Sequence, residues 1–292
     1  MARVAVQLTD FTAGEFSPRL DGRNDLAKYS SACKRLENFV VFPHGSVVRR
    51  PGTTFISEVK DSTKKTRLIP FEFSTTQTYM LEFGNQYIRI YKDKGQVLDS
   101  GSAVEISTPY LEAELFDLKF AQSADVMYIT HPNHEVEKLS RTSHTAWTLT
   151  DVDFTKGPMQ DLNTTDTTLN PGQAGVGTGV ALVASAVTGT NGGSGFLSTD
   201  VGRFVYLHGG YAKITGVTDT TNATISILST LSASTATANW QLGVFSDTTG
   251  HPSCVTFFEQ RLVFAGTSEQ PQTIFFLNQV TMKTWIKILE EQ

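Results

Sequence analysis

Two short segments hold the residue types that metal binding or catalysis would need. The segment His131-Pro-Asn-His134-Glu135 places two imidazoles beside a carboxylate, and the segment LEAELFDL carries Glu112, Glu114 and Asp117. Paired carboxylates could serve as the acid and base of a glycosidase, and imidazoles are common metal ligands. A Pro-Asn turn and an exposed polar face explain the same residues without a ligand. We therefore predict no catalytic, metal-binding or cofactor-binding residues and no enzymatic activity.

Other catalytic patterns are missing from the sequence. The glycine-rich stretch GQAGVGTG (172–179) is not preceded by a hydrophobic strand or followed by the lysine of a phosphate-binding loop. No serine lies in a Gly-x-Ser-x-Gly elbow. Cys33 and Cys254 lie far apart and are predicted to be buried free thiols, as expected for a protein assembled in the cytoplasm. The start of the chain does not resemble a signal peptide, and no run is long and apolar enough for a membrane span.

The elements that carry these residues are predicted to be antiparallel strands. Alternating apolar residues flank a Gly84-Asn85 turn, which predicts a hairpin of strands 79–83 and 87–91. Groups of short antiparallel strands are the unit of a β-propeller, so we predict meanders that form part of one. The further strands predicted are 118–121, 126–130, 136–139 and 146–149 in a second group, and 254–258 and 261–265 in a third.

An inserted module is predicted between the second and third groups. Residues 151–250 hold three basic residues against seven acids and are rich in Thr, Gly, Ala and Ser. Aromatic and branched side chains within them could still form a core, which predicts a small β-sandwich or barrel. Its strands are predicted at 180–186, 204–207, 212–217, 223–228 and 240–242.

The first residues have a different pattern. Gly14, Pro18 and Gly22 predict an extended arm. From Leu26 to Val40 the apolar residues recur every three to four positions, which predicts one short amphipathic helix, with Asn24 or Asp25 as its N-cap. A hairpin of strands 39–42 and 46–48 follows.

These segments also carry a family resemblance. The runs FTAGEFSPRLDGRNDLAKY and KRLENFVVFPHGSVVRRPGTTFI resemble the amino-terminal signature of tail proteins from short-tailed bacteriophages and prophages, the tail nozzle or tail tubular protein B-like group. The resemblance continues to about Phe276, through DLKFAQSADVMYITHPNHEVEKLSR, FLSTDVGRFVYLHGGYAKIT and PSCVTFFEQRLVFAGT. It implies a virion structural protein, made in the bacterial cytoplasm, that forms a ring, hexameric by analogy, around the DNA exit channel of the tail.

The charge distribution indicates which partners the chain meets. Residues 1–70 carry twelve Lys and Arg against seven Asp and Glu, whereas the remainder carries twelve against twenty-two. The basic first part could contact DNA phosphates, but its cations alternate with acids, as they do in protein interfaces. We expect it to dock on another tail subunit or on a neighbouring copy. The expected contact residues are Arg23, Lys34, Arg35, Arg49 and Arg50.

Four regions are predicted along the chain. They are a docking segment (1–62), a propeller-like meander region (63–156), the inserted module (157–250) and the start of a further meander (251–292). After Phe276 the chain reads NQVTMKTWIKILEEQ where the family resemblance leads one to expect a sequence such as SGDYENMD, and one set of codons for the observed residues encodes that sequence in another frame. We therefore expect a frameshift that truncates a longer tail gene.

Two other functions stay open. A host-receptor or glycan-binding tail module would use the inserted residues 157–250. An envelope-degrading tail hydrolase would use Glu112 and Glu114 as its carboxylate pair.

Overall fold

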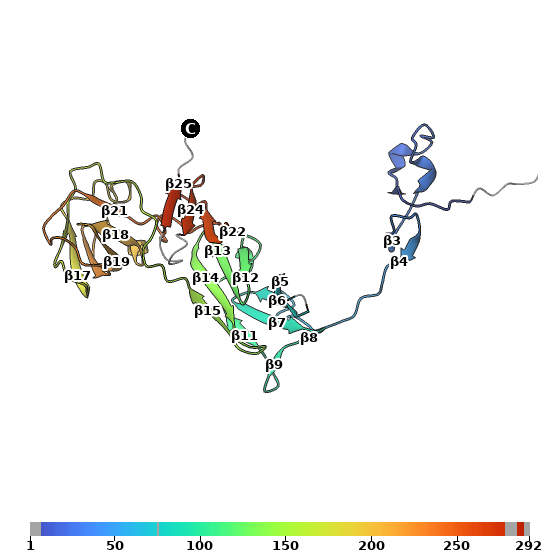
Figure 1. Cartoon of the computed structure of the whole chain (residues 1–292), viewed down its shortest axis with the longest axis horizontal. Coiled ribbons are helices and arrows are strands. Elements are labelled where there is room, and N and C mark those ends of the chain that lie inside the picture. Colours follow the sequence, from blue (N-terminus) through green and yellow to red (C-terminus); the bar gives the residue numbers. More distant parts are fainter. Residues whose placement is uncertain (1–6, 75, 278–284, 289–292) are drawn as a thin grey trace, which may run out of the picture. The chain divides into compact units, whose positions relative to one another are not determined.

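The computed structural model describes residues 7–74, 76–277 and 285–288, and the chain divides into two units, Met1–Ile56 and Ser57–Gln292 (Figure 1). Strands make up 42% of the structure and helices 6%, so the predicted mainly β class with antiparallel sheets is confirmed. The helices in the described part of the chain are single 3-10 turns. None of them has the length and apolar composition of a membrane span.

The first unit holds two small pairs of strands. β1 (Gly14–Glu15) pairs in parallel with β2 (Ala32–Cys33), and the turns η1 (Pro18–Leu20) and η2 (Tyr29–Ser31) lie between them. β3 (Phe39–Val41) and β4 (Val47–Arg49) form the predicted hairpin.

The amphipathic helix predicted from Leu26 to Val40 is wrong in extent, since only the turn η2 is helical there. Ala32 is extended and pairs with Gly14, which ends the turn after Ser31. Asp25 does not cap a helix, because its carboxylate binds the Arg23 guanidinium.

The second unit begins with a five-stranded antiparallel sheet. Its strands are β5 (Arg67–Glu72), β6 (Thr78–Gly84), β7 (Tyr87–Lys92), β8 (Gly95–Gln96) and β11 (Glu105–Ser107). The order is β11-β7-β6-β5, and β8 also pairs with β7. The hairpin predicted around Gly84-Asn85 is confirmed as β6 and β7. β9 (Leu98–Asp99) and β10 (Ser102–Ala103) form a separate short hairpin.

Two four-stranded meanders follow the pattern predicted from the sequence. The first contains β12 (Lys119–Ser123), β13 (Val126–His131), β14 (His134–Arg141) and β15 (Trp147–Asp151). The second contains β22 (Cys254–Phe258), β23 (Arg261–Ala265), β24 (Ile274–Leu277) and β25 (Trp285–Ile288). In both, the strands pair antiparallel in chain order. Of the tail expected to be atypical, residues 278–284 and 289–292 lie outside the described residues.

The first meander is packed on both faces, as a propeller blade is. Met127, Ile129 and Leu139 share a core with the five-stranded sheet. Val136, together with the half-buried Tyr128, packs with β23 and β24 in another core. Alternate residues of a strand point to opposite faces, so the five-stranded sheet and the second meander cover opposite faces of the first.

The module between the meanders is a six-stranded sheet curled into a half-barrel. Its order is β16-β17-β20-β19-β18-β21. The sheet encloses its own core, which includes Leu182, Ile214, Ile225 and Trp240. The strands are β16 (Leu169–Pro171), β17 (Gly177–Ala184), β18 (Phe204–Leu207), β19 (Gly210–Val217), β20 (Asn222–Ile227) and β21 (Trp240–Leu242). The turns η4 (Asn191–Gly193) and η5 (Ser198–Asp200) connect β17 to β18.

The cysteines differ in part from the prediction. Both are free thiols, but Cys33 is half-buried and Cys254 is exposed. Cys254 alternates with inward-facing residues on β22, where the side chains at 254, 256 and 258 face outward. Cys254 is exposed because it lies on the opposite face of β22 from Val255 and Phe257, which pack against the core.

Candidate functional site

The first unit has almost no interior of its own. Among residues 7–56, Gly45 is the only buried residue. Its carbonyl accepts a hydrogen bond from the Phe11 amide at 2.9 Å, which brings the start of the arm onto the β3–β4 turn. A Cβ at this position would lie 2.7 Å from the Asp10 Oδ1 atom, and the φ angle of +96° favours glycine. The contact between arm and turn therefore depends on backbone atoms rather than on a hydrophobic core.

Large apolar side chains of the same unit face solvent. They are between 39% and 81% exposed, although they lie within eighteen residues of one another. Val40 and Val48 are cross-strand partners, so they lie on one face of the hairpin, while Phe39 lies on the other. An exposed apolar group on so small a unit marks an interaction surface. We call this set the apolar hairpin surface: Phe39, Val40, Phe42, Val48, Phe55 and Ile56.

The five cations predicted as contact residues fall into two groups. Three of them form exposed ion pairs: Arg23 with Asp25 at 2.6 Å, Lys34 with Asp21 at 3.6 Å and Arg35 with Glu37 at 2.8 Å. Exposed pairs of this kind contribute at most about 1 kcal/mol each.

The other two cations lie on or beside the hairpin. Arg49 ends β4 and has no ion pair among the described residues, and the Arg50 Nε atom donates to the Asn38 Oδ1 atom at 3.3 Å. Their positive charges stay available to a partner next to the apolar hairpin surface. The sequence signal for that surface is the run Phe39–Phe42, because a two-stranded hairpin cannot bury both of its faces.

A second cluster brings together Glu114, His131 and His134, which come from the two segments with potential metal-binding or catalytic residues. Glu114 ends the turn η3 (Glu112–Glu114), His131 ends β13 and His134 begins β14. One ligand atom from each of the three side chains lies within 4.8 Å of the others. The His134 Nε2 atom and the Glu114 Oε2 atom are 2.9 Å apart, and His131 is buried. No local pattern predicts that these residues meet, since Glu114 lies seventeen residues before His131.

The surroundings set the charge of the cluster. Burial lowers the pKa of His131, which keeps its imidazole neutral at neutral pH. Burial alone would raise the pKa of Glu114, but hydrogen bonds from the Leu111 amide and from His134 outweigh it and lower the pKa. The cluster therefore combines the Glu114 carboxylate with the uncharged imidazole of His131.

Glu112, the other carboxylate of the pair that an alternative hydrolase would use, has structural partners. The Glu112 Oε1 atom accepts a hydrogen bond from the Lys65 amide at 2.9 Å, and the Glu112 amide donates to the Asn85 Oδ1 atom at 3.0 Å. These contacts tie η3 to the turn between β6 and β7. Glu112 and Glu114 thus bind different neighbours, Lys65 and His134.

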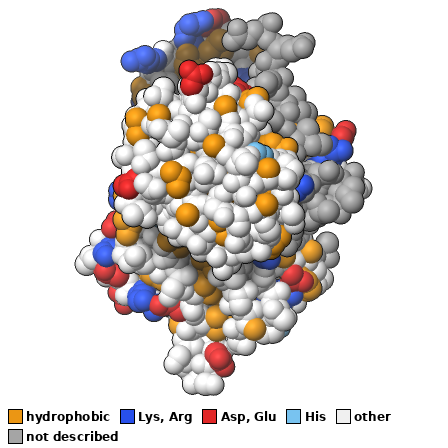
Figure 2. All heavy atoms as spheres, turned by 90° about the vertical axis from the view of Figure 1, so that its left-hand side faces the viewer, with side chains coloured by type: hydrophobic (Ala, Val, Ile, Leu, Met, Phe, Trp, Pro, Cys, Tyr) orange, Lys and Arg blue, Asp and Glu red, His pale blue; other side chains and the backbone are white. Residues whose placement is uncertain are grey.

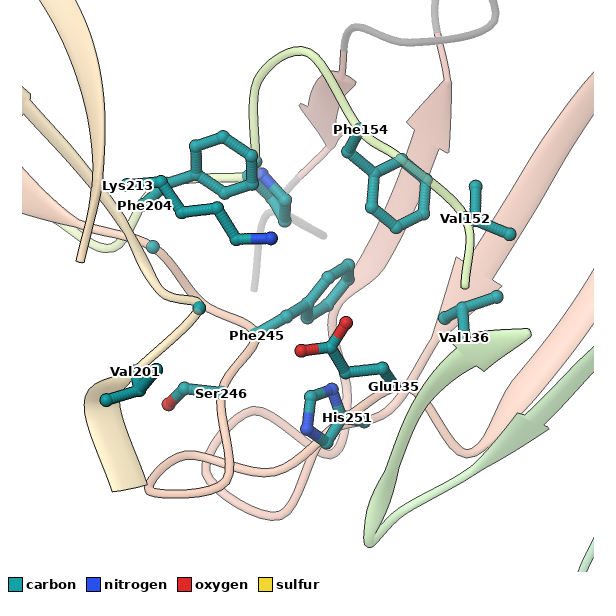
Figure 3. A pocket seen from close by; sticks show the side chains of 14 residues that line it. Glu135, Val136, Val152, Phe154, Val201, Phe204, Lys213, Phe245, Ser246 and His251 are labelled. Atoms are coloured by element: carbon teal, nitrogen blue, oxygen red, sulfur yellow. The ribbon is translucent and has the colours of Figure 1, made fainter. Parts of the chain in front are cut away.

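A cavity of about 40 Å³ lies where the half-barrel module meets the first meander (Figure 3). The Glu135 carboxylate and the Lys213 ammonium group reach into it beside Phe204 and Phe245 (Figure 3). Ligand sites are typically about 300–1,000 Å³, whereas this volume holds only a few water molecules. The cavity is therefore a feature of the junction rather than a candidate ligand site.

The half-barrel module offers few charges to a partner. Figure 2 shows its outer face with sparse charged side chains and scattered single hydrophobic ones.

Comparison with known proteins adds no relative, because no family model matches the chain and a search of curated proteins finds no match. The two surfaces with a distinctive chemistry are therefore the apolar hairpin surface and the Glu114–His131–His134 cluster.

Proposed function

We propose that this chain is a structural subunit of the tail of a short-tailed phage, resembling the nozzle group, which acts by forming a ring with copies of itself. The resemblance of the first residues and the propeller-like meanders support this role. The observation that carries the proposal is the first unit, which exposes seven large apolar side chains, Leu8 and the six of the apolar hairpin surface, and among residues 7–56 buries only a glycine. Such a unit gains most of its order from a surface supplied by a partner.

Charge complementarity indicates a second copy of this chain as that partner. Residues 1–56 carry eight Lys and Arg against five Asp and Glu, and residues 57–292 carry sixteen against twenty-four. The positive first unit of one copy therefore suits the negative second unit of the next. A contact between two different surfaces is heterologous, and a rotation that closes produces a ring around a central channel.

The apolar hairpin surface can supply a useful share of the association energy. Complete burial of a large apolar side chain contributes about 1.5–3 kcal/mol, so covering the exposed half of each contributes roughly 1 kcal/mol. A neighbour that covers both faces of the hairpin and the segment 55–56 would gain several kcal/mol from the six side chains together. This gain is comparable with the free-energy cost of association, about 4–15 kcal/mol. Charge pairs and ring closure offset a further part of that cost.

Sedimentation velocity of the untagged full chain over a concentration series tests the proposal. The wild type is expected to form a discrete oligomer, and the double variant Val40→Ser/Val48→Ser is expected to remain monomeric at the same concentrations. The matched control is Val176→Ser/Val183→Ser, which removes two exposed valines from the half-barrel module and leaves the oligomer intact.

Two results would contradict the proposal. One is a wild-type chain that stays monomeric up to about 100 µM, equivalent to an association free energy weaker than roughly −5.5 kcal/mol. The other is an oligomer that the Val40→Ser/Val48→Ser change leaves as stable as the wild type. Circular dichroism of all variants shows whether the second unit is still folded.

A further inference from the structure

We propose that Glu114, His131 and His134 form a binding site for a divalent transition metal of the zinc class. Two imidazoles and one carboxylate are a known ligand set for zinc. The site does not depend on the proposed assembly, because all three residues belong to the second unit. It holds η3 against the turn between β13 and β14.

The distances suit a metal centre after small movements. Zinc binds imidazole nitrogen at about 2.0–2.1 Å and carboxylate oxygen at about 2.0–2.2 Å, so ligand atoms in a tetrahedral site lie roughly 3.3 Å apart. The 2.9 Å between the His134 Nε2 atom and the Glu114 Oε2 atom is close to that value, and no pair in the cluster exceeds 4.8 Å. Side-chain rotations that move the ligand atoms of His131 and Glu114 by about one ångström or less would bring the three ligand atoms to this spacing.

His131 changes one hydrogen bond when it binds the metal. Its Nδ1 atom accepts a hydrogen bond from the Asn133 amide at 3.2 Å. If His131 binds the metal through Nδ1, the metal displaces the Asn133 amide. If it binds through Nε2, the ring proton moves to Nδ1, which can then no longer accept the hydrogen bond from that amide. Asn133 is exposed, so its amide can donate to water instead and the exchange costs little.

The groups behind the ligands hold them in place. The Leu111 amide donates to the Glu114 Oε2 atom at 2.9 Å, and the buried Tyr110 ring meets His134 edge-on with centroids 5.2 Å apart. Supporting contacts of this kind orient ligands in natural metal sites.

A buried carboxyl group, that of Glu137, interacts electrostatically with the cluster. Glu137 is 8% exposed, and its Oε2 atom has no hydrogen-bond partner among the described residues. The interaction involves the His134 ring and the hydroxyl of the buried Tyr110. A divalent ion at the cluster would favour the ionised form of Glu137 through its positive charge. Three protein ligands leave the fourth position to water.

Zinc titration calorimetry and cobalt absorption spectroscopy on the untagged, EDTA-treated full chain test the site. The wild type is expected to bind one Zn²⁺, and Co²⁺ is expected to give the intense visible bands of a four-coordinate ion. Glu114→Gln and His134→Gln are each expected to weaken binding by at least about tenfold. Asp247→Asn is the matched control, because it removes the carboxylate of a His–carboxylate pair, His251–Asp247 at 2.9 Å, that has no third ligand among the described residues.

Thermal melting separates metal loss from misfolding. Without metal, Glu114→Gln is expected to melt close to the wild type, and added Zn²⁺ is expected to raise the melting temperature of the wild type and of Asp247→Asn but not of Glu114→Gln. The proposal is overturned if the wild type binds no Zn²⁺, if Glu114→Gln binds as tightly as the wild type, or if Asp247→Asn abolishes binding.

Discussion

At the scale of single residues, the second unit contains buried polar groups of two kinds. Arg203 and Asp200 are fully buried as a pair 2.9 Å apart, and further hydrogen bonds satisfy the guanidinium. Its Nε atom donates to the Gly243 carbonyl, and its Nη2 atom donates to the Gln160 side chain. The Glu137 Oε2 atom, by contrast, is buried without a partner in the described structure. The first kind stabilises the fold and the second makes stability depend on pH.

Asp200→Ala is expected to destabilise the second unit strongly. The change leaves the Arg203 charge buried without its carboxylate, which costs about 3–5 kcal/mol. Urea unfolding followed by tryptophan fluorescence measures the loss, since Trp240 lies in the core of the same module. Asp247→Ala is the control, because its side chain is 61% exposed and its ion pair contributes at most about 1 kcal/mol. Equal losses in the two variants would show that the buried pair has no special role.

Glu137→Gln is expected to remove part of the pH dependence of stability. Burial, and then repulsion from Asp151, raise the pKa of Glu137 to about 7, although Tyr110 and His134 act in the opposite direction. The folded state therefore binds this proton more tightly than the unfolded state, where the pKa is about 4.3. The stability from this proton is complete below that unfolded value and is lost as the pH rises to about 7.

Urea unfolding at a series of pH values, in EDTA, checks this expectation. Between about pH 4.5 and 7 the wild type is expected to lose on the order of 2 kcal/mol more than Glu137→Gln. Parallel profiles for the two proteins would mean that Glu137 ionises in the folded state as it does in the unfolded chain.

At the scale of elements, the sequence predicted what depends on local patterns. Alternation around Gly84-Asn85 and around the two meanders identified the strands, because each hairpin is specified by neighbouring residues. The apolar periodicity from Leu26 led to a wrong helix prediction, because the parallel pairing of Ala32 with Gly14 joins segments eighteen residues apart. The Glu114–His131–His134 cluster was missed for the same reason: each half was visible, but the packing that joins η3 to β14 has no signature in the chain.

Gly45→Ala is expected to loosen the β3–β4 hairpin. The new Cβ meets Asp10, and a left-handed conformation costs an alanine about 1–2 kcal/mol. Amide hydrogen exchange of Phe42 and Gly45, whose amides bond within the turn, is expected to accelerate several-fold to tenfold or more. Gly52→Ala is the control, because that glycine has ordinary backbone angles and no atom near the added Cβ. Unchanged exchange in Gly45→Ala would show that the turn does not need a glycine.

At the scale of the whole molecule, the proposed assembly rests on the contrast between the two units. The first is basic and exposes apolar side chains, whereas the second is acidic and encloses three hydrophobic cores. Composition alone predicted the charge contrast. It could not show that the first unit lacks a core, because that depends on which faces the hairpin covers.

Arg49→Glu/Arg50→Glu is expected to weaken self-association through charge. These cations lie beside the apolar hairpin surface, so reversing them opposes the acidic second unit of a neighbouring copy. Wild-type association is expected to weaken as NaCl rises from about 0.05 M to about 0.5 M, and the variant is expected to associate weakly at both. Lys64→Glu/Lys65→Glu makes the same charge change on exposed side chains of the second unit and serves as control. Equal effects of the two variants would assign the result to net charge alone.

Negative-stain electron microscopy of the untagged full chain shows whether the protein forms rings. Closed rings of uniform size are expected for the wild type and for Val176→Ser/Val183→Ser, and single particles are expected for Val40→Ser/Val48→Ser. Wild-type particles that remain single at concentrations where the second unit is fully folded, or rings that persist in Val40→Ser/Val48→Ser, would contradict the proposed assembly.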